Sequence, residues 1–422
     1  MQPKKRKIHS LTGRIDLKLM ENAYKAVKRN RGAAGIDKMT IDMFATCERR
    51  YLETLMQSLK NRSYVPQPLK RVYIPKGKGK KRPLGIPTVT CRIAQEAVRS
   101  LINPTFERLF HENSYGFRPG RNCHQAVHKV KEYLNQGYRY VVDADIKGFF
   151  DNIPHELIMT EISNEIADGN ILSLIEKFLK SGVMEEGKLL PTTKGTPQGG
   201  VISPLLANII LNRFDHKLDQ AGYKFVRYAD DFVILCKTKE QAETALALAK
   251  EILEGEMKLS LSAEKTKIVH LKEGFDFLGF HFTLSGISMK DKSVEKFKEA
   301  IRKKTIRSQN LNSKVIEEIN RVIRGTVNYF AKPFTTTIKQ FNKLEQWIRV
   351  RLRSMKTKCI SKTNNWKVKT KHLERMGLLS CIRLCRMRMN VAYVPRNRQP
   401  LEAPPGARKM HAGKYRELTL LR

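Results

Sequence analysis

Two adjacent aspartates, Asp230 and Asp231, stand between two segments rich in apolar, aromatic and β-branched residues, 224–229 and 232–236. Such segments around a short polar pair predict a β-hairpin with the acids at its turn. Neighbouring carboxylates repel each other, so a fold that keeps both usually provides a cation to offset them. Considered alone, the pair is explained equally well by a solvated acidic turn.

A third acid, Asp145, comes at the end of the apolar segment 138–146, which predicts a buried strand. The end of such a strand is a common place for a catalytic carboxylate in an α/β core. Strand alternation places Asp143 on the same face, but only the acid at the strand end needs to lie at a site. Asp145, Asp230 and Asp231 together supply three carboxylates, enough to hold two Mg²⁺ ions about 4 Å apart for polymerase chemistry.

Two further segments carry groups that suit a nucleotide. Residues 70–75 and 84–87 predict strands joined by a basic tip, in which Lys76 and Arg82 suit a triphosphate as a point charge and a bidentate fork. A solvated hairpin with lysines protecting its edges is the alternative. The loop 194–200 ends in Gly199 and Gly200, which allow close backbone approach to a ligand, and a helix is expected from Ser203.

The charge of the whole chain predicts a polyanionic partner. The 422 residues include 80 Lys and Arg against 41 Asp and Glu, a formal net charge of +39, and residues 281–422 hold 34 of the basic residues against 9 acidic ones. This excess favours salt-dependent binding to phosphates. We expect no membrane partner, because no apolar run approaches the ~20 residues of a spanning helix and no signal peptide begins the sequence.

Helical periodicity predicts one helix over 42–60 and basic amphipathic helices over 291–305, 313–330 and 336–355. Aromatic residues between the basic ones favour a nucleic-acid surface on the later helices, although a solvated face has the same pattern. The seven cysteines form no CxxC pair and indicate reduced thiols in a cytosolic protein.

Six motifs follow one another along the chain, namely Leu-Gly-Ile-Pro-Thr (84–88), Tyr-Gly-Phe-Arg-Pro-Gly-Arg (115–121), Asp-Ile-Lys-Gly-Phe-Phe-Asp (145–151), Thr-Pro-Gln-Gly-Gly (196–200), Tyr-Ala-Asp-Asp (228–231) and Phe-Leu-Gly-Phe (277–280). With these motifs the chain resembles a bacterial group II intron-encoded reverse transcriptase and maturase. The resemblance is specific because all six occur in order, and it covers residues 10–282 closely and the basic helices more loosely.

The resemblance implies an α+β fold: a right-hand polymerase with fingers, palm and helical thumb, followed by a small basic DNA-binding domain. The implied divisions are an N-terminal extension and basic arm (1–40), fingers and palm (41–285), a thumb or X (maturase) domain (286–360) and a DNA-binding domain (361–422). Many relatives end in an HNH endonuclease domain. Its Cys pairs and His are missing before Arg422, so the resemblance is to endonuclease-lacking, group IIC-like members.

The resemblance also implies a role for particular residues. Two Mg²⁺ ions would bind the three acids with help from the Ile146 carbonyl, and Phe150 would exclude a ribose 2′-hydroxyl so that dNTPs are used. The remaining implied contacts are the triphosphate for Lys76 and Arg82, the nucleotide pocket for Gln198, the leaving phosphate for Lys265, and RNA or template for Arg29, Arg31, Arg118 and Arg121.

The implied function is RNA-directed DNA synthesis together with assistance to intron splicing and mobility. The implied partners are the group II intron RNA, an RNA template with a DNA or RNA primer, target DNA and dNTPs, in a bacterial cytoplasm at the nucleoid or in a ribonucleoprotein. A splicing-only maturase is disfavoured, because a scaffold needs neither the three acids nor Phe150 and Gln198. A reverse transcriptase domesticated for repair or defence remains an alternative. An RNA-templated RNA polymerase is the weakest one, given Phe150 and the Tyr-Ala-Asp-Asp turn.

Overall fold

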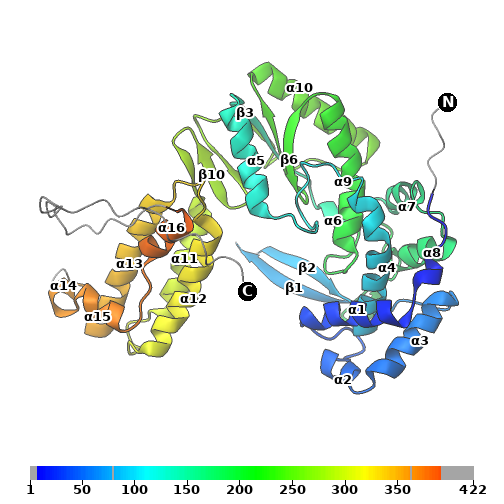
Figure 1. Ribbon diagram of the computed structural model, residues 1–422, viewed down its shortest axis with the longest axis horizontal. Coiled ribbons are helices and arrows are strands. Elements are labelled where there is room, and N and C mark those ends of the chain that lie inside the picture. Colours follow the sequence, from blue (N-terminus) through cyan, green and yellow to red (C-terminus); the bar gives the residue numbers. More distant parts are fainter. Residues whose placement is uncertain (1–6, 78–79, 362–363, 391–422) are drawn as a thin grey trace, which may run out of the picture. The chain divides into compact units, whose positions relative to one another are not determined.

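The computed structural model describes residues 7–77, 80–361 and 364–390 (Figure 1). The chain divides into two compact units, Met1–Val294 and a second one that begins at Glu295. Long helices and three small sheets alternate in the first unit, whereas the second is helical. Helices and sheets are therefore mixed, as expected for an α+β reverse transcriptase fold. In the described ranges, no helix has the length and apolar character to span a membrane.

The first unit begins with a short turn, η1 (Thr12–Arg14), and helices that pack around the long helix α4 (Val89–Glu107). Helix α1 (Leu17–Arg29) contacts α4, and the Asp16 carboxylate caps it by accepting the Leu19 amide at 2.7 Å. The single helix predicted over 42–60 is wrong. Two helices form instead, α2 (Ile41–Ala45) and α3 (Glu48–Lys60), because Cys47 leaves the helical region at φ −131° and ψ 36°.

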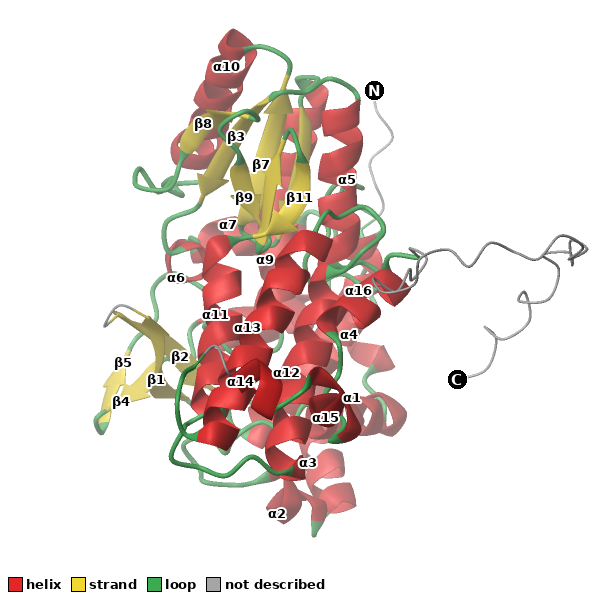
Figure 2. Ribbon diagram, turned by 90° about the vertical axis from the view of Figure 1, so that its left-hand side faces the viewer, coloured by secondary structure: helices red, strands yellow, loops and turns green. Residues whose placement is uncertain are grey.

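The predicted basic hairpin is confirmed as part of a four-stranded sheet. Strands β1 (Leu69–Gly77) and β2 (Lys80–Ile86) pair antiparallel, and β1 also pairs parallel with β4 (Val183–Glu185), which forms a hairpin with β5 (Lys188–Leu190). The order in this sheet is β2-β1-β4-β5. Figure 2 shows the sheet as a separate layer from the strands that carry the acids.

The acids lie on a second four-stranded sheet, which has the order β6-β7-β3-β8. Its strands are β3 (Tyr140–Asp145), β6 (Lys224–Tyr228), β7 (Asp231–Cys236) and β8 (Lys267–His270), all paired antiparallel with their neighbours. Helix α10 (Lys239–Lys250) packs on β3 and β7, whereas α5 (Cys123–Asn135) and α9 (Ser203–Gln220) contact β6. Residues 232–236 of β7 are buried, so the strand is anchored in the core and its first residue emerges.

The remaining elements of the first unit connect these layers. Along the sequence, helices α6 (Phe149–Asn152), α7 (His155–Ser163) and α8 (Gly169–Leu179) come between β3 and β4. A π-helical turn, η2 (Glu251–Glu256), follows α10. A three-stranded antiparallel sheet is formed by β9 (Phe275–Phe277), β10 (Phe280–Thr283) and β11 (Gly286–Met289). Phe275 and Phe282 stack across it with ring centroids 4.8 Å apart.

The three helices predicted at the start of the basic region are confirmed to within two residues. They are α11 (Asp291–Lys304), α12 (Ser313–Phe330) and α13 (Ile338–Thr357), followed by α14 (Asn364–Lys367), α15 (Thr370–Arg375) and α16 (Cys381–Arg388). Helix α16 packs on α13, where the buried Glu345 carboxylate accepts hydrogen bonds from the Ser380 hydroxyl at 2.8 Å and the Ile382 amide at 2.9 Å. The acid thereby satisfies one backbone amide at the start of α16.

Candidate active site

Two adjacent strands bring the three predicted acids to one end of the sheet with the order β6-β7-β3-β8. Asp145 is the last residue of β3, Asp231 is the first residue of β7, and the two are direct register partners. Asp230 precedes Asp231 in the tight turn between β6 and β7, so the predicted acidic hairpin is confirmed. Ala229 makes this turn possible by adopting a left-handed backbone conformation with φ 58°.

The acids raise one another's proton affinity. Loss of surrounding water, followed by the charges of Asp230, Asp145 and Asp143, raises the pKa of Asp231 to about 6. Loss of water and the Asp145 charge also raise the pKa of Asp230. The Asp231 side chain is exposed to solvent, although protein atoms around its carboxyl group displace part of the water. A cation at this end of the sheet would offset the repulsion.

The positively charged side chain of Lys265 lies directly against one of the predicted catalytic acids. Its Nζ is 2.5 Å from Asp145 Oδ2, and this hydrogen bond raises the pKa of the Lys265 ammonium. Asp145 is held further by its main chain, since its carbonyl accepts the Ser262 amide at 2.8 Å. Lys265 was predicted to lie near a leaving phosphate, and the structure places it at the acids.

The donor set suits Mg²⁺, because carboxylate and carbonyl oxygens are the ligands that this hard cation prefers. In the described part of the chain, however, no three acidic, His or Cys side chains are gathered into a ready cage for a metal ion. Mg²⁺ in polymerase sites is commonly held by one or two carboxylates plus substrate phosphates, so an incomplete protein cage fits this cation. Ile146, whose carbonyl was predicted to assist, is buried next to Asp145.

The predicted nucleotide residues Arg82 and Gln198 meet although they are far apart in sequence. Arg82 Nε donates to Gln198 Oε1 at 2.6 Å, and Gln198 Nε2 donates to Asp151 Oδ2 at 3.0 Å. The Gly85 amide also donates to the Gln198 carbonyl at 2.8 Å, which fastens the loop 196–200 to strand β2. Sequence reasoning missed Asp151, although it closes the motif 145–151 and its spacing from Asp145 could have indicated it.

Phe150 and Lys76 are the two other residues predicted to contact the nucleotide. Phe150 lies in the short helix α6, half-buried, with its ring packed edge-on against Phe149 at 5.4 Å. The backbone of Lys76 belongs to β1, but its side chain lies outside the described part of the structure. Its predicted contact with a triphosphate therefore stays a prediction.

The four arginines predicted to contact RNA separate into exposed and buried ones. Arg29 and Arg31 are exposed at the end of α1. Arg118 is buried, and its guanidinium donates to Glu107 Oε1 at 2.9 Å and to the His111 and Ser114 carbonyls. This burial argues against the predicted RNA contact of Arg118. Arg121 is half-exposed and lies 5.3 Å from the ring centroid of Tyr115.

Two family models match the sequence over most of the described chain. Residues 74–282, from β1 to β10, match the model described as reverse transcriptase (RNA-dependent DNA polymerase), and residues 294–375 match the group II intron maturase-specific domain. The chain is 37% identical over 286 residues to Protein YkfC of Escherichia coli K12, covering 59% of this chain and 74% of that protein. The chain belongs to the group II intron-encoded reverse transcriptases.

A second relative is itself described as a group II intron-encoded protein. This reverse transcriptase is 35% identical over 325 residues to the group II intron-encoded protein LtrA of Lactococcus lactis, covering 61% of this chain and 54% of LtrA. A solved structure of Candida albicans telomerase with an RNA fragment aligns with a TM-score of 0.43 and 14% identity, over 80% of this chain and 66% of the other. The maturase match begins at residue 294, next to the boundary between the two structural units.

Proposed function

We propose that the chain is an RNA-directed DNA polymerase that also serves as a maturase, copying RNA into cDNA and assisting the splicing and mobility of a group II intron. The observation that carries this proposal is the pairing of Asp145 with Asp231 across neighbouring strands, with Asp230 beside them. Fold stability gains nothing from this crowding, since like charges repel. Three acids at one strand end instead suit nucleotidyl transfer with divalent cations.

Two Mg²⁺ ions are the proposed cofactors, held by Asp145, Asp230 and Asp231 with the Ile146 carbonyl assisting. When bound, such ions activate the attacking 3′-hydroxyl and stabilise the leaving pyrophosphate. The aspartates act as ligands and carry no proton in the reaction. Lys265 supplies positive charge beside Asp145 and would approach the leaving phosphate of the nucleotide.

The incoming nucleotide is proposed to be a dNTP. Arg82 would bind its triphosphate through a bidentate fork, and Gln198 would line the pocket, in an orientation supported by its bonds to Arg82 and Asp151. Phe150 would press against the sugar and leave no room for a 2′-hydroxyl. The triphosphate contact of Lys76 belongs to the same proposal.

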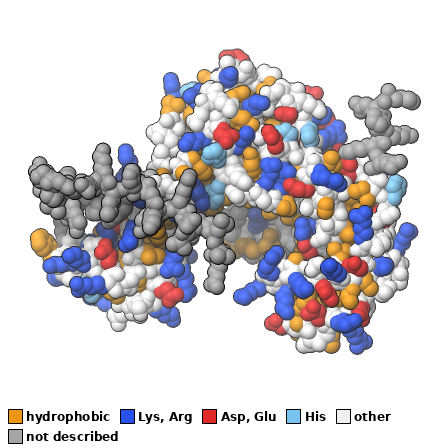
Figure 3. Space-filling view, in the orientation of Figure 1, with side chains coloured by type: hydrophobic (Ala, Val, Ile, Leu, Met, Phe, Trp, Pro, Cys, Tyr) orange, Lys and Arg blue, Asp and Glu red, His pale blue; other side chains and the backbone are white. Residues whose placement is uncertain are grey.

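RNA is the proposed template and intron partner, with a DNA or RNA primer and target DNA as further partners. Support comes from the surplus of Lys and Arg over residues 281–422 and from exposed Arg29 and Arg31. Figure 3 shows basic side chains distributed over the visible faces of both units. Such surfaces neutralise phosphates. We place the protein in the bacterial cytoplasm, at the nucleoid or in a ribonucleoprotein, because these nucleic acids lie there.

The variant Asp230→Ala separates the polymerase from RNA binding. We expect primer extension on an RNA template to fall by about a thousandfold or more, since a metal ligand is lost. RNA affinity should stay within about twofold of the wild-type value, because it rests on the basic surfaces. Asp42→Ala, which removes an exposed acid of α2, is the control and should retain both properties.

Retained cDNA synthesis by Asp230→Ala would contradict the metal assignment. A wild-type protein that binds intron RNA and assists splicing, yet extends no primer, would instead identify a splicing-only maturase with a polymerase fold. The two outcomes differ in the wild-type control, so a single set of assays distinguishes them.

A further inference from the structure

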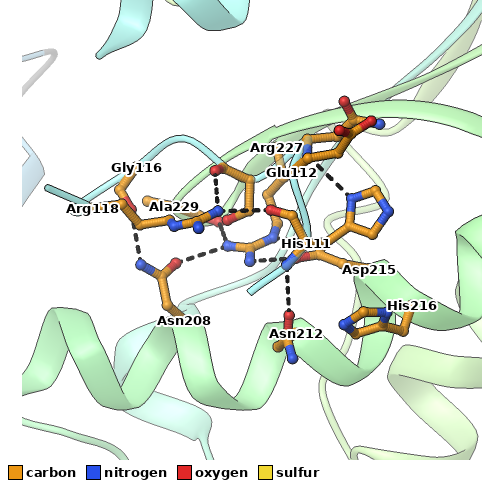
Figure 4. Close-up of polar contacts among 12 residues, drawn as sticks. His111, Glu112, Gly116, Arg118, Asn208, Asn212, Asp215, His216, Arg227 and Ala229 are labelled. Carbon is orange, nitrogen blue, oxygen red and sulfur yellow. Dashed lines mark hydrogen bonds and ion pairs between the residues drawn. The ribbon is translucent and has the colours of Figure 1, made fainter. Parts of the chain in front are cut away.

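A charged side chain lies completely inside the first unit, directly behind the acidic turn. Arg227, on strand β6, has no exposed surface, and neither has its partner Asp215 on helix α9. The pair is bidentate: Arg227 Nε donates to Asp215 Oδ1 at 2.7 Å and Nη2 donates to Asp215 Oδ2 at 2.5 Å. Figure 4 shows the guanidinium at the centre of a group of polar contacts.

The third nitrogen of this guanidinium reaches the turn itself. Arg227 Nη1 donates to the carbonyl of Ala229 at 2.9 Å, and also to Asn208 Oδ1 at 3.0 Å (Figure 4). Ala229 is the residue with the left-handed backbone, and Asp230 follows it. The guanidinium thus holds the carbonyl of the one residue whose conformation turns the chain into the acid pair.

Helix α9, which carries Asn208, also holds the opposite side of the turn. Asn208 Nδ2 donates to the Gly116 carbonyl at 2.8 Å, and Gly116 lies so close to the turn that a Cβ there would meet the Ala229 amide nitrogen at 2.3 Å. The Tyr115 amide donates to the Arg227 carbonyl at 2.9 Å. Ala229 is therefore enclosed between the Arg227 guanidinium and the Gly116 backbone.

We propose that Arg227, held by Asp215 and Asn208, is a positioning residue that fixes the Ala229 turn and thereby sets the placement of Asp230 and Asp231 for metal binding. This proposal rests on the proposed function, because it assumes that the two acids bind Mg²⁺. Helix α9, which carries Asp215 and Asn208, begins at Ser203, soon after Gln198. The pair thus also links the acidic turn to the segment that carries a proposed nucleotide residue.

Stability alone is a poor explanation for the ion pair. Removing two charges from water is costly, and well-packed apolar residues of similar size often replace a buried pair without loss of stability. An apolar side chain, however, could not donate to the Ala229 carbonyl. The hydrogen bonds that an apolar pair would lose include the one to the acidic turn, which is the reason to assign Arg227 a role in positioning.

Helix α9 offers a matched pair of variants. Asn208 and Asn212 lie one turn apart on α9, and both bond to backbone groups of residues 109–116. Asn212 accepts from the His111 amide at 3.0 Å and donates to the Leu109 carbonyl at 3.2 Å, neither of which belongs to the acidic turn (Figure 4). Asn208→Ala should lower the affinity for Mn²⁺ about tenfold, whereas Asn212→Ala should leave it unchanged. Electron paramagnetic resonance of a Mn²⁺ titration measures this affinity without any nucleotide, and the signal absent from Asp230→Ala defines the site.

A double variant, Arg227→Met with Asp215→Leu, separates positioning from folding. We expect it to melt within a few degrees of the wild-type protein and to bind Mn²⁺ about tenfold more weakly. Equal Mn²⁺ affinity in wild type, Asn208→Ala and the folded double variant would overturn the proposal. If the double variant does not fold, the comparison of Asn208→Ala with Asn212→Ala decides alone, and equal Mn²⁺ affinity in those two would overturn it.

If the proposed function is wrong, the Mn²⁺ titration and the primer-extension assay give a different pattern. A wild-type protein that shows no Mn²⁺ signal dependent on Asp230 would refute the metal site itself. If wild type binds Mn²⁺ at this site and Asn208→Ala weakens the binding, but no primer is extended, then the positioning role stands and the polymerase assignment fails.

Discussion

Asp143 lies two residues before Asp145 on β3, but its carboxyl group has different surroundings. It lies among Lys267, its register partner on β8, and Lys290 and Asp276. Loss of surrounding water raises the pKa of Asp143 to about 6, although the two lysines act in the opposite direction. Deprotonating this half-buried acid therefore costs folding free energy, and the protein is more stable when it is protonated.

The variant Asp143→Asn should stabilise the protein in a pH-dependent way. The stability associated with protonated Asp143 is fully present below pH 3.8, the ordinary value, and is lost as the pH rises through about 6. Asn mimics the protonated form, so we expect a gain of about 1 kcal/mol at pH 7.5, after allowance for partial exposure, and none near pH 4. Urea unfolding at several pH values measures it, and a gain that is constant with pH would contradict the pKa of Asp143.

Phe150 carries the proposed discrimination against ribonucleotides. Replacement by the smaller Val opens space beside the sugar, so we expect the ratio of kcat/KM for UTP to that for dTTP to rise about tenfold or more. Use of dTTP itself serves as the internal control and should change little. An unchanged ratio in single-nucleotide incorporation would remove Phe150 from the sugar gate.

Residue types and spacing could predict the three acids and a triphosphate contact for Arg82, whereas the nucleotide role of Gln198 came only from the family resemblance. They could not predict which arginines are buried. Arg118 stands in a polar motif and Arg227 in the predicted hairpin segment 224–229, yet both are inside the protein. Their carboxylate partners Glu107 and Asp215 are brought to them by helices α4 and α9, which only the tertiary fold positions.

Among the elements, the loop 196–200 and strand β2 approach each other most closely at a glycine. A Cβ on Gly199 would lie 2.4 Å from the Gly85 carbonyl oxygen, and its φ is 116°. The approach lets Gln198 bond to the Gly85 amide and to Arg82. The paired glycines were predicted to allow close backbone approach to a ligand, and the structure shows that one of them allows approach to a strand.

Gly199→Ala should therefore displace Gln198 and raise the KM for dNTPs about tenfold, with a smaller effect on kcat. Gly187→Ala is the matched control, because Gly187 also has a left-handed φ of 81° but no atom within 4 Å of a Cβ. The control separates backbone strain from the close approach. Equal kinetics for the two variants would show that the approach has no part in nucleotide binding.

Element boundaries followed the sequence where periodicity was strong. Helix α12 agrees with its predicted range, since buried Ile316, Ile319, Ile323 and Val327 recur at helical spacing. The predicted helix 42–60 divides at Cys47, where the pattern gives no Gly or Pro to mark the break. The conformation of that residue depends on how α2 and α3 each pack, which periodicity does not encode.

For the whole molecule, the charge distribution indicates how nucleic acid would be bound. Residues 281–422 have a net charge of +25, and residues 1–280 have +14. The matched maturase segment, 294–375, lies within the more basic part. A surface that neutralises phosphates releases counterions, so binding to RNA should weaken steeply as salt increases.

We expect the logarithm of RNA affinity to fall with the logarithm of salt concentration with a slope of about −4 or steeper, as six or more neutralised phosphates give. Fluorescence anisotropy of a labelled RNA measures it between about 0.1 and 0.5 M salt. The Asp230→Ala protein should give the same slope, which shows that the acidic turn is not part of this surface. A slope near zero would contradict electrostatic binding.

Primer extension is the direct test of RNA-directed DNA synthesis. The unaltered protein is given an RNA template, a DNA primer and Mg²⁺, with dNTPs in one reaction and NTPs in a parallel one. We expect elongated product with dNTPs and essentially none with NTPs. Extension with NTPs alone, or none with either set while the RNA remains bound, would contradict it.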